Sequence, residues 1–210
     1  MHPNSKLLFE KYAMPLFRDG MRVLEVGPDA TPSGYCQLVK NPAIRWEGVD
    51  MCPSPGLTWV APDEYHFPLP DNAFDIVLSG QVLEHVRKAW IWMREVARVC
   101  KPGGLVITIN PVNWEYHEWP VDCWRIYPEG IRALHEDAGL TTRLALFESL
   151  APLSKPLSIM YLLRQAVKTL MGRKPCIPWW ASGVVDTISI GVKEPPPAPD
   201  GDGVSFAKIA

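Results

Sequence analysis

The sequence lacks the patterns that mark disulfide-rich, zinc-binding, nucleic-acid-binding and membrane-spanning proteins. Its cysteines are odd in number, scattered and never arranged as a CxxC pair, so neither a disulfide framework nor a structural zinc site is expected. They are Cys36, Cys52, Cys100, Cys123 and Cys176. The formal net charge is −2, which gives no electrostatic case for binding nucleic-acid phosphates. No apolar run approaches the roughly 18 residues of a membrane span.

The amino-terminal residues, MHPNSKLLFEKY, are too polar for a signal peptide. Unpaired cysteines suit a reducing compartment, so we expect a cytoplasmic protein. The 210 residues, 47% of them apolar, suit one domain with a sizeable core and some additions. We expect that domain over 1–193, with a substrate loop at 110–130 and a helical insertion at 152–175. Residues 194–210 are rich in proline and glycine, which predicts a disordered tail.

Glycine is scarce where a dinucleotide fingerprint would need it. A buried strand predicted over 21–26 runs into a turn in which Gly27 is followed by Pro28 and Asp29. The fingerprint uses three glycines so that the backbone can approach a pyrophosphate. Pro28 has no N–H to offer a phosphate, and Asp29 would repel one. The turn therefore favours a phosphate-free, cationic nucleoside, and S-adenosylmethionine has both properties.

A second carboxylate, Asp50, ends the next predicted strand, 44–49. The spacing from the first strand is that of a nucleotide-binding βαβ unit, in which both strand ends meet at one edge of a parallel sheet. A carboxylate there suits a ribose diol, because it can accept both hydroxyl protons. The two strand ends thus predict a nucleoside site.

From Met21 to about Leu146 the chain resembles the class I S-adenosylmethionine-dependent methyltransferases. Glu25 and Gly27 match the family's first motif, which the chain leaves at Asp29. The segment APDEYHFPLPDNAFDIVLSGQVLEHV is similar to the family's run that carries an adenine-contacting acid, here Asp63. EVARVCKPGGLVITINP is similar to the following helix, Gly-Gly turn and fifth strand. The resemblance implies a Rossmann-like, doubly wound α/β fold whose mostly parallel sheet has an antiparallel last strand. It also implies S-adenosyl-L-methionine as cofactor, with a binding set of Glu25, Gly27, Asp50, Met51, Asp63, Glu64 and Ser79.

Periodicity and turn residues predict the remaining elements. Helices are expected near 5–15, over 33–40 and over 82–100 with Gly103 as C-cap, and again over 128–138. Strands are expected over 57–60, 74–79, 105–109, 140–147 and 184–192. An apolar helix over 156–171 is expected to form a lid or a homodimer face.

Methyl transfer to a hydroxyl needs a base or a metal, because a neutral hydroxyl is a poor nucleophile. His85 follows the fourth strand at the expected donor–acceptor edge, and an imidazole titrates near neutral pH. His117 is the second candidate base, with Asp122 beside it in the catalytic set. Glu84 is expected to be structural or solvent-facing, and His135 to lie on a helix surface.

The loop over 110–130 carries concentrated aromatic and charged side chains, which suit the apolar face and the hydroxyls of a sugar. It is similar to a run in small bacterial methyltransferases of polysaccharide and glycoside pathways. The predicted substrate residues are Trp114, Tyr116, Glu118, Trp124 and Arg125. In the alternative, the loop is a structured cover that packs its tryptophans onto the core and pairs Arg125 with Asp122.

The sequence therefore predicts an O-methyltransferase for a small sugar or glycoside, of which a methylmannoside 1-O-methyltransferase is one specific case. His85, His117, Glu118 and Asp122 are also possible ligands of Mg²⁺, but no fixed ligand spacing supports an ion, so a metal-free site is favoured. Three alternatives stay open. They are an N- or C-methyltransferase of an aromatic or polyketide-like metabolite, a non-catalytic methyltransferase-fold partner subunit, and a Rossmann-like oxidoreductase with a degenerate fingerprint.

Overall fold

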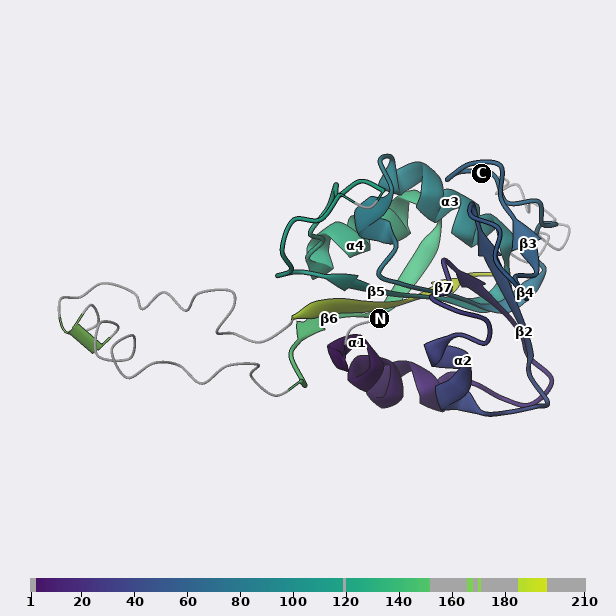
Figure 1. The fold of residues 1–210 in the computed structure, drawn as a ribbon, viewed down its shortest axis with the longest axis horizontal. Helices are drawn as coiled ribbons and strands as arrows, with labels where there is room; N and C mark the ends of the chain where they lie inside the picture. Colours follow the sequence, from purple (N-terminus) through teal and green to yellow (C-terminus); the bar gives the residue numbers. More distant parts are fainter. Residues whose placement is uncertain (1–2, 119, 152–165, 168–169, 171–184, 196–210) are drawn as a thin grey trace, which may run out of the picture.

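The computed structural model describes residues 3–118, 120–151, 166–167, 170 and 185–195. Its centre is a seven-stranded sheet in the order β3-β2-β1-β4-β5-β7-β6 (Figure 1). The strands are β1 (Arg22–Val26), β2 (Arg45–Asp50), β3 (Trp59–Val60), β4 (Phe74–Gly80), β5 (Cys100–Pro111), β6 (Leu140–Glu148) and β7 (Asp186–Lys193). Neighbouring strands are parallel except at β7, which is antiparallel to β5 and β6. The predicted sheet with an antiparallel last strand is confirmed.

Helices cover both faces of the sheet. On one face lie α1 (Pro3–Leu8) and α2 (Gly34–Val39), and on the other lie α3 (Ala89–Val99) and α4 (Pro128–Asp137) (Figure 1). Successive side chains of a strand point to opposite faces. In β1, Val23 therefore packs in the core on the α1 side of the sheet, and Leu24 packs in the core on the α3 and α4 side. Burial on both faces explains why the inner strands read as nearly continuous apolar runs.

The prediction for the third helix is wrong at its start and in its C-cap. The segment Leu83–His85 forms a short 3₁₀ turn, and α3 begins only at Ala89. The helix ends at Val99, because Pro102 removes a backbone donor just beyond it. Gly103 is therefore not a C-cap. It lies within β5 at a φ of 78°, where the β4–β5 register slips between Phe74 and Ile76.

The placement of His135 on a helix surface is also wrong, because its side chain is fully buried between α4 and the β6–β7 pair. Its Nδ1 lies 2.9 Å from the hydroxyl of Thr142. A Cβ on Gly191 would lie 3.0 Å from the ring, so the bare backbone of β7 makes the space for it. Burial, helped by nearby Arg132, lowers the pKa of His135 to about 4.

Most of the predicted helix over 156–171, and of the insertion over 152–175, lies outside the described residues, as does the tail from 196 to 210. The homodimer or lid that this helix was expected to form therefore stays a prediction. Among the described residues, none of the helices combines the length and apolarity needed to cross a membrane.

Candidate functional site

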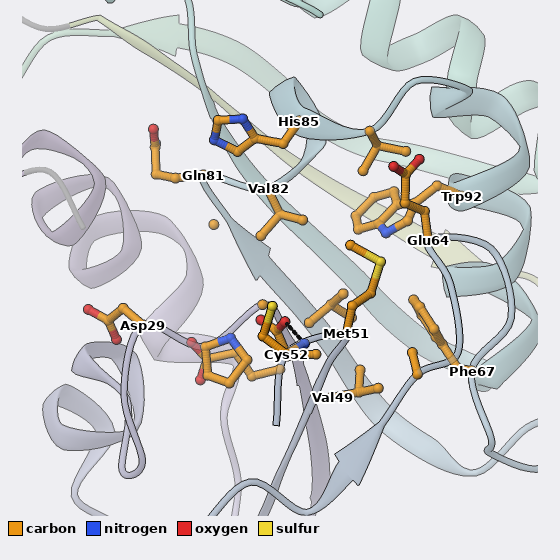
Figure 2. Close-up of a pocket in the computed structure, with 18 of the residues that line it drawn as sticks. Asp29, Val49, Met51, Cys52, Glu64, Phe67, Gln81, Val82, His85 and Trp92 are labelled. Carbon is orange, nitrogen blue, oxygen red and sulfur yellow. Dashed lines mark hydrogen bonds between the residues drawn. The ribbon is translucent and has the colours of Figure 1, made fainter. Parts of the chain in front are cut away.

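A pocket of about 580 Å³ opens at the carboxyl ends of β1, β2 and β4 (Figure 2). The sheet order reverses between β1 and β4, and such switch points are where open α/β sheets bind ligands. Most of the predicted cofactor set lines the pocket, namely Glu25, Gly27, Asp50, Met51, Asp63 and Glu64. Ser79 does not line it. That side chain is buried and donates to the carbonyl of Val26 at 3.2 Å.

Gly27 keeps the floor of the pocket bare. Its φ is 70°, a left-handed conformation that glycine adopts without steric cost. A Cβ there would lie 2.4 Å from Cγ2 of Val82, which is too close for any side chain. Its N–H donates to the carbonyl of Val49 at 2.9 Å, so the turn is tied to β2. The backbone at this turn is thus fixed and open to a ligand.

Glu25, two residues before Gly27, fixes the turn through its buried carboxylate. Its carboxylate is almost fully buried and accepts hydrogen bonds from the Ser33 hydroxyl and from Nε1 of Trp46, the latter at 2.8 Å. The Ser33 hydroxyl also accepts from the N–H of Cys36 and so caps α2. Burial raises the pKa of Glu25 to about 7, against the lowering effect of its two donors. Glu25 therefore joins β1, β2 and the start of α2.

Two carboxylates line the pocket, that of Asp50 at the end of β2 and that of Asp63 on the loop after β3. Asp50 accepts from the N–H of Cys52 at 2.8 Å. Asp63 accepts from the N–H of Tyr65 at 2.7 Å and lies 2.8 Å from Nδ1 of His66. The hydrogen bond from the N–H of Tyr65 is the main cause that lowers the pKa of Asp63. Glu64, next in the chain, pairs with Arg87 at 3.0 Å.

Several pocket residues were missed by sequence reasoning, and most of them are apolar. They are Val26, Tyr35, Val49, Cys52, Ala61, Phe67, Gly80, Gln81, Val82, Val86, Trp92 and Pro120. Pro28 and Asp29 of the predicted donor turn line the pocket as well. Phe67 belongs to the irregular loop before β4, and Trp92 to the inner face of α3, as Figure 2 shows. A loop residue and a helix residue share no sequence period, so no pattern indicated that they meet.

Gln81 is the most unusual of these residues. It has a positive φ of 60°, a conformation uncommon for residues other than glycine. Its Nε2 donates to the Ser5 hydroxyl at 2.7 Å and to Asp186 at 3.1 Å, which links α1 and β7 to the pocket. Its Oε1 is buried and has no hydrogen-bond partner among the described residues. The positive φ is a signal only the structure could give.

His85 lies across the pocket from Asp29 and Cys52 (Figure 2), and its ring contacts that of His117. His85 lines the pocket, and the two rings lie edge to face with centroids 4.9 Å apart. Nδ1 of His85 donates to the carbonyl of Val121 at 2.5 Å, and Nδ1 of His117 donates to that of Glu115 at 3.0 Å. A carbonyl can only accept, so in each ring Nδ1 carries a proton, and in the neutral form of each ring Nε2 is the acceptor.

Glu84 lies with these histidines, and of its two predicted placements, structural or solvent-facing, the structure excludes the second. Its side chain is 1% exposed, and Oε1 is 3.9 Å from Nε2 of His85. Burial raises the pKa of Glu84 to about 8. The 3₁₀ turn over Leu83–His85 directs Glu84 inward, and Glu84, His85 and His117 offer ligand atoms that all lie within 4.8 Å of one another.

The other site residues predicted in this loop do not line the pocket. Asp122 pairs with Arg125, whose Nη2 donates at 2.7 Å, and this bond holds the pKa of Asp122 at about 2. Trp124 donates from Nε1 to the carbonyl of Val86 at 2.7 Å and packs against the core. Glu118 accepts from the hydroxyl of Tyr116. The Asp122–Arg125 pair and the packed Trp124 are the arrangement of the structured-cover alternative.

A separate surface hollow is lined by exposed aromatic side chains. Trp114, Tyr116 and Tyr127 line it, together with residues 112, 113 and 115. Trp114 and Tyr116, two of the predicted substrate residues, therefore line this hollow and not the main pocket.

Residues 12–108 match the family model of the methyltransferase domain. A Mycobacterium ulcerans protein named "Probable phthiotriol/phenolphthiotriol dimycocerosates methyltransferase 2" is 32% identical over 129 residues, which cover 53% of this chain and 48% of the relative. The chain spans less than half the length of the curated relatives it matches.

Solved structures share the fold over nearly the whole chain. A chain from the complex between the Haloferax volcanii Trm112 methyltransferase activator and a methyltransferase matches with a TM-score of 0.63 at 18% identity, covering 93% of this chain and 90% of that one. A Haemonchus contortus phosphoethanolamine N-methyltransferase bound to S-adenosyl-L-methionine matches with a TM-score of 0.58 at 16% identity, covering 91% of this chain and 52% of that one. Residues 12–108 are thus similar to a methyltransferase domain, and the chain has the class I fold of the solved methyltransferases that it matches.

Proposed function

We propose that the protein is an O-methyltransferase that moves the methyl group of S-adenosylmethionine to a hydroxyl of a small sugar or glycoside. The observation that supports it most is one pocket with a bare Gly27 turn and carboxylates at one end and His85 at the other. The donor supplies a methyl group on a sulfonium, which is already an excellent leaving group. The protein's task is therefore to position the two substrates and to manage the hydroxyl proton.

The charges that line the pocket fit this donor. Five carboxylates line it, those of Glu25, Asp29, Asp50, Asp63 and Glu64, and among the described residues no lysine or arginine does so. Such a lining repels the pyrophosphate of a dinucleotide and favours a cation without phosphates. We assign Asp50 to the ribose hydroxyls, Asp63 and Glu64 to the adenine edge, and Met51 to the adenine face.

The acceptor is assigned to the end that His85 and His117 form. His85 faces the pocket, and in the neutral ring Nε2 is the kind of acceptor that a hydroxyl proton needs. An amine acceptor would make less use of such a group. The exposed faces of Trp114 and Tyr116 are suited to the C–H side of a longer glycoside that extends beyond the pocket.

A flat apolar acceptor is the second candidate, as for an N- or C-methyltransferase of an aromatic or polyketide-like metabolite. Phe67, Val86 and Trp92 give the pocket an apolar wall that would suit it. The M. ulcerans relative, whose name refers to dimycocerosates, is consistent with an apolar acceptor too. The cost of burying Glu84 and two imidazoles beside such a molecule argues against it.

The test has a binding step and a transfer step. Calorimetric titration is expected to show binding of S-adenosylmethionine and of its demethylated product, but not of NAD. Labelled donor is then incubated with a panel of glycosides, including short methylated mannosides, and with matched phenols and amines. Label in glycosides alone is the expected result. Transfer only to phenols or amines would replace the proposal by the second candidate, and binding of NAD without the donor would end both.

A further inference from the structure

Glu84, His85 and His117 bring one carboxylate and two imidazoles together from two segments of the chain. Glu84 and His85 lie in the 3₁₀ turn after β4, and His117 lies in the loop after β5. Their ligand atoms all fall within 4.8 Å of one another, and Oε1 of Glu84 is 3.9 Å from Nε2 of His85. A tetrahedral ion with bonds of about 2.0–2.2 Å holds its ligand atoms roughly 3.3–3.6 Å apart. Closure therefore needs an inward shift of about an ångström, which is within reach of a side chain on a loop.

Both histidines are oriented as metal ligands are. In each ring Nδ1 donates to a backbone carbonyl, that of Val121 or that of Glu115, and Nε2 is left bare. Metal-binding histidines almost always donate their other ring nitrogen in this way, which fixes the tautomer and the ring plane. Here two neighbouring histidines both donate from Nδ1 to a backbone carbonyl, and this repetition favours a metal site over a single histidine packed in the core.

The carboxylate supplies an independent sign. Glu84 is 1% exposed, and its Oε2 is buried without a hydrogen-bond partner among the described residues. A buried carboxylate oxygen without a partner is costly, so native structures satisfy such atoms with a donor or a cation. Arg125, the nearby cation, is already committed to Asp122.

We infer that Glu84, His85 and His117 form a binding site for a divalent transition-metal ion of the zinc type. Two nitrogen ligands and one oxygen ligand favour such an ion over Mg²⁺, which prefers an all-oxygen shell. Three protein ligands leave at least one coordination position open. His85 lines the pocket, so the site borders the end assigned to the acceptor.

The role of this site in methyl transfer rests on the proposed function, whereas ion binding does not. At the acceptor end, an ion would lower the pKa of a hydroxyl and orient its oxygen toward the methyl group. Glu118 and Asp122, the other ligands that the sequence offered, are engaged with Tyr116 and Arg125. The ligand set that the geometry supports therefore differs from the one the sequence suggested.

The test uses the 210-residue chain after treatment with a chelator and dialysis. Co²⁺ is titrated in, with visible absorption and equilibrium dialysis as readouts, and Zn²⁺ is then added as a competitor. One Co²⁺ per chain is expected, with the absorption bands of a nitrogen- and oxygen-ligated ion, displaced by Zn²⁺. Glu84→Gln and His117→Gln should each weaken Co²⁺ binding at least about tenfold, since even changes behind the ligands cost 10–100-fold.

His66→Gln is the matched control. His66 also lies against a carboxylate, that of Asp63 at 2.8 Å, but it is exposed and belongs to a different loop. It should bind Co²⁺ as the unmodified chain does. Titration with S-adenosylmethionine shows that each variant is folded, because neither Glu84 nor His117 lines the pocket. His117 is partly exposed, so His117→Gln decides the matter even if Glu84→Gln does not fold.

Three results would overturn the site: no stoichiometric Co²⁺ binding, unchanged affinity in a folded His117→Gln variant, or loss of binding in His66→Gln. The outcome is separable from that of the proposed function. A chain that binds Co²⁺ but methylates no glycoside keeps the metal site and loses the assigned reaction. A chain that methylates glycosides without binding Co²⁺ keeps the reaction and loses the metal site.

Discussion

Acidification should destabilise this protein through one buried imidazole, that of His135. The ring is fully buried, with Nδ1 2.9 Å from the Thr142 hydroxyl and Nε2 3.4 Å from the Ser189 hydroxyl. Both hydroxyls can serve a neutral ring, but no carboxylate is among its hydrogen-bond partners in the described residues. Burial, with a smaller contribution from Arg132, lowers the pKa of His135 to about 4.

The sign follows from which state takes up the proton first. An unfolded histidine has a pKa of about 6.5, so the unfolded chain is protonated while the native ring is still neutral. The stability that neutral His135 contributes is complete above pH 6.5 and is lost as the pH falls toward 4. Integrating the proton uptake between these pKa values gives a loss of about 2 kcal/mol at pH 5 and about 3 kcal/mol at pH 4.

The assay compares the unmodified chain with His135→Gln, whose amide keeps hydrogen-bonding capacity but does not titrate. The free energy of unfolding in urea is measured for both at pH 7.5 and at pH 5. The variant should be less stable at pH 7.5, yet lose about 2 kcal/mol less on acidification. The comparison cancels the other titrating groups, including Glu25 and Glu84. Equal losses in both proteins, or an NMR titration of His135 near pH 6.5, would refute the reasoning.

Three further predictions concern the pocket. Gly27→Ala should lower donor affinity more than about tenfold, because its Cβ would meet Val82 at 2.4 Å, and adding Val82→Ala should recover part of the loss. Unchanged affinity in calorimetry would contradict this. Asp50→Ala should weaken donor binding by roughly 1.5–3 kcal/mol, the scale of hydrogen bonds to a charged group, and an unaltered Kd would remove Asp50 from the ribose site. His85→Gln or His117→Gln should lower turnover by ~10²–10⁴-fold with donor affinity nearly constant. Near-normal turnover in both variants would show that neither histidine acts as the base.

Most of the fold could be predicted because its strands and helices carry local periods. The buried strands of the sheet are short apolar runs bounded by turn residues, and the resemblance to class I methyltransferases implied how they join into a mostly parallel sheet with an antiparallel last strand. The helix over 82–100 was extended too far toward the amino terminus because Val82 and Val86 fall at helical spacing. Both are apolar for another reason, since they line the pocket.

The two halves of the pocket differed in how well they could be predicted. Glu25 and Asp50 lie at or just before the ends of parallel strands, and strand ends meet at one edge of the sheet whatever the loops do. The apolar wall and Gln81 depend on how a loop, a helix and a left-handed residue pack, which leaves no period in the sequence. His135 was misplaced because the space it fills is made by Gly191, on a distant strand.

The acceptor end is built by two segments that backbone hydrogen bonds hold together. The carbonyl of Glu84 accepts from the N–H of Cys123 at 2.7 Å and from that of Trp124 at 3.3 Å. The carbonyl of Val86 accepts from Nε1 of Trp124, and His85 donates to Val121. A change within either segment therefore shifts Glu84 and His85 together. We therefore expect that substitutions at the exposed aromatic side chains of Trp114, Tyr116 and Tyr127 can change the choice of acceptor and keep the reaction. Substitutions within the two hydrogen-bonded segments should impair the reaction itself.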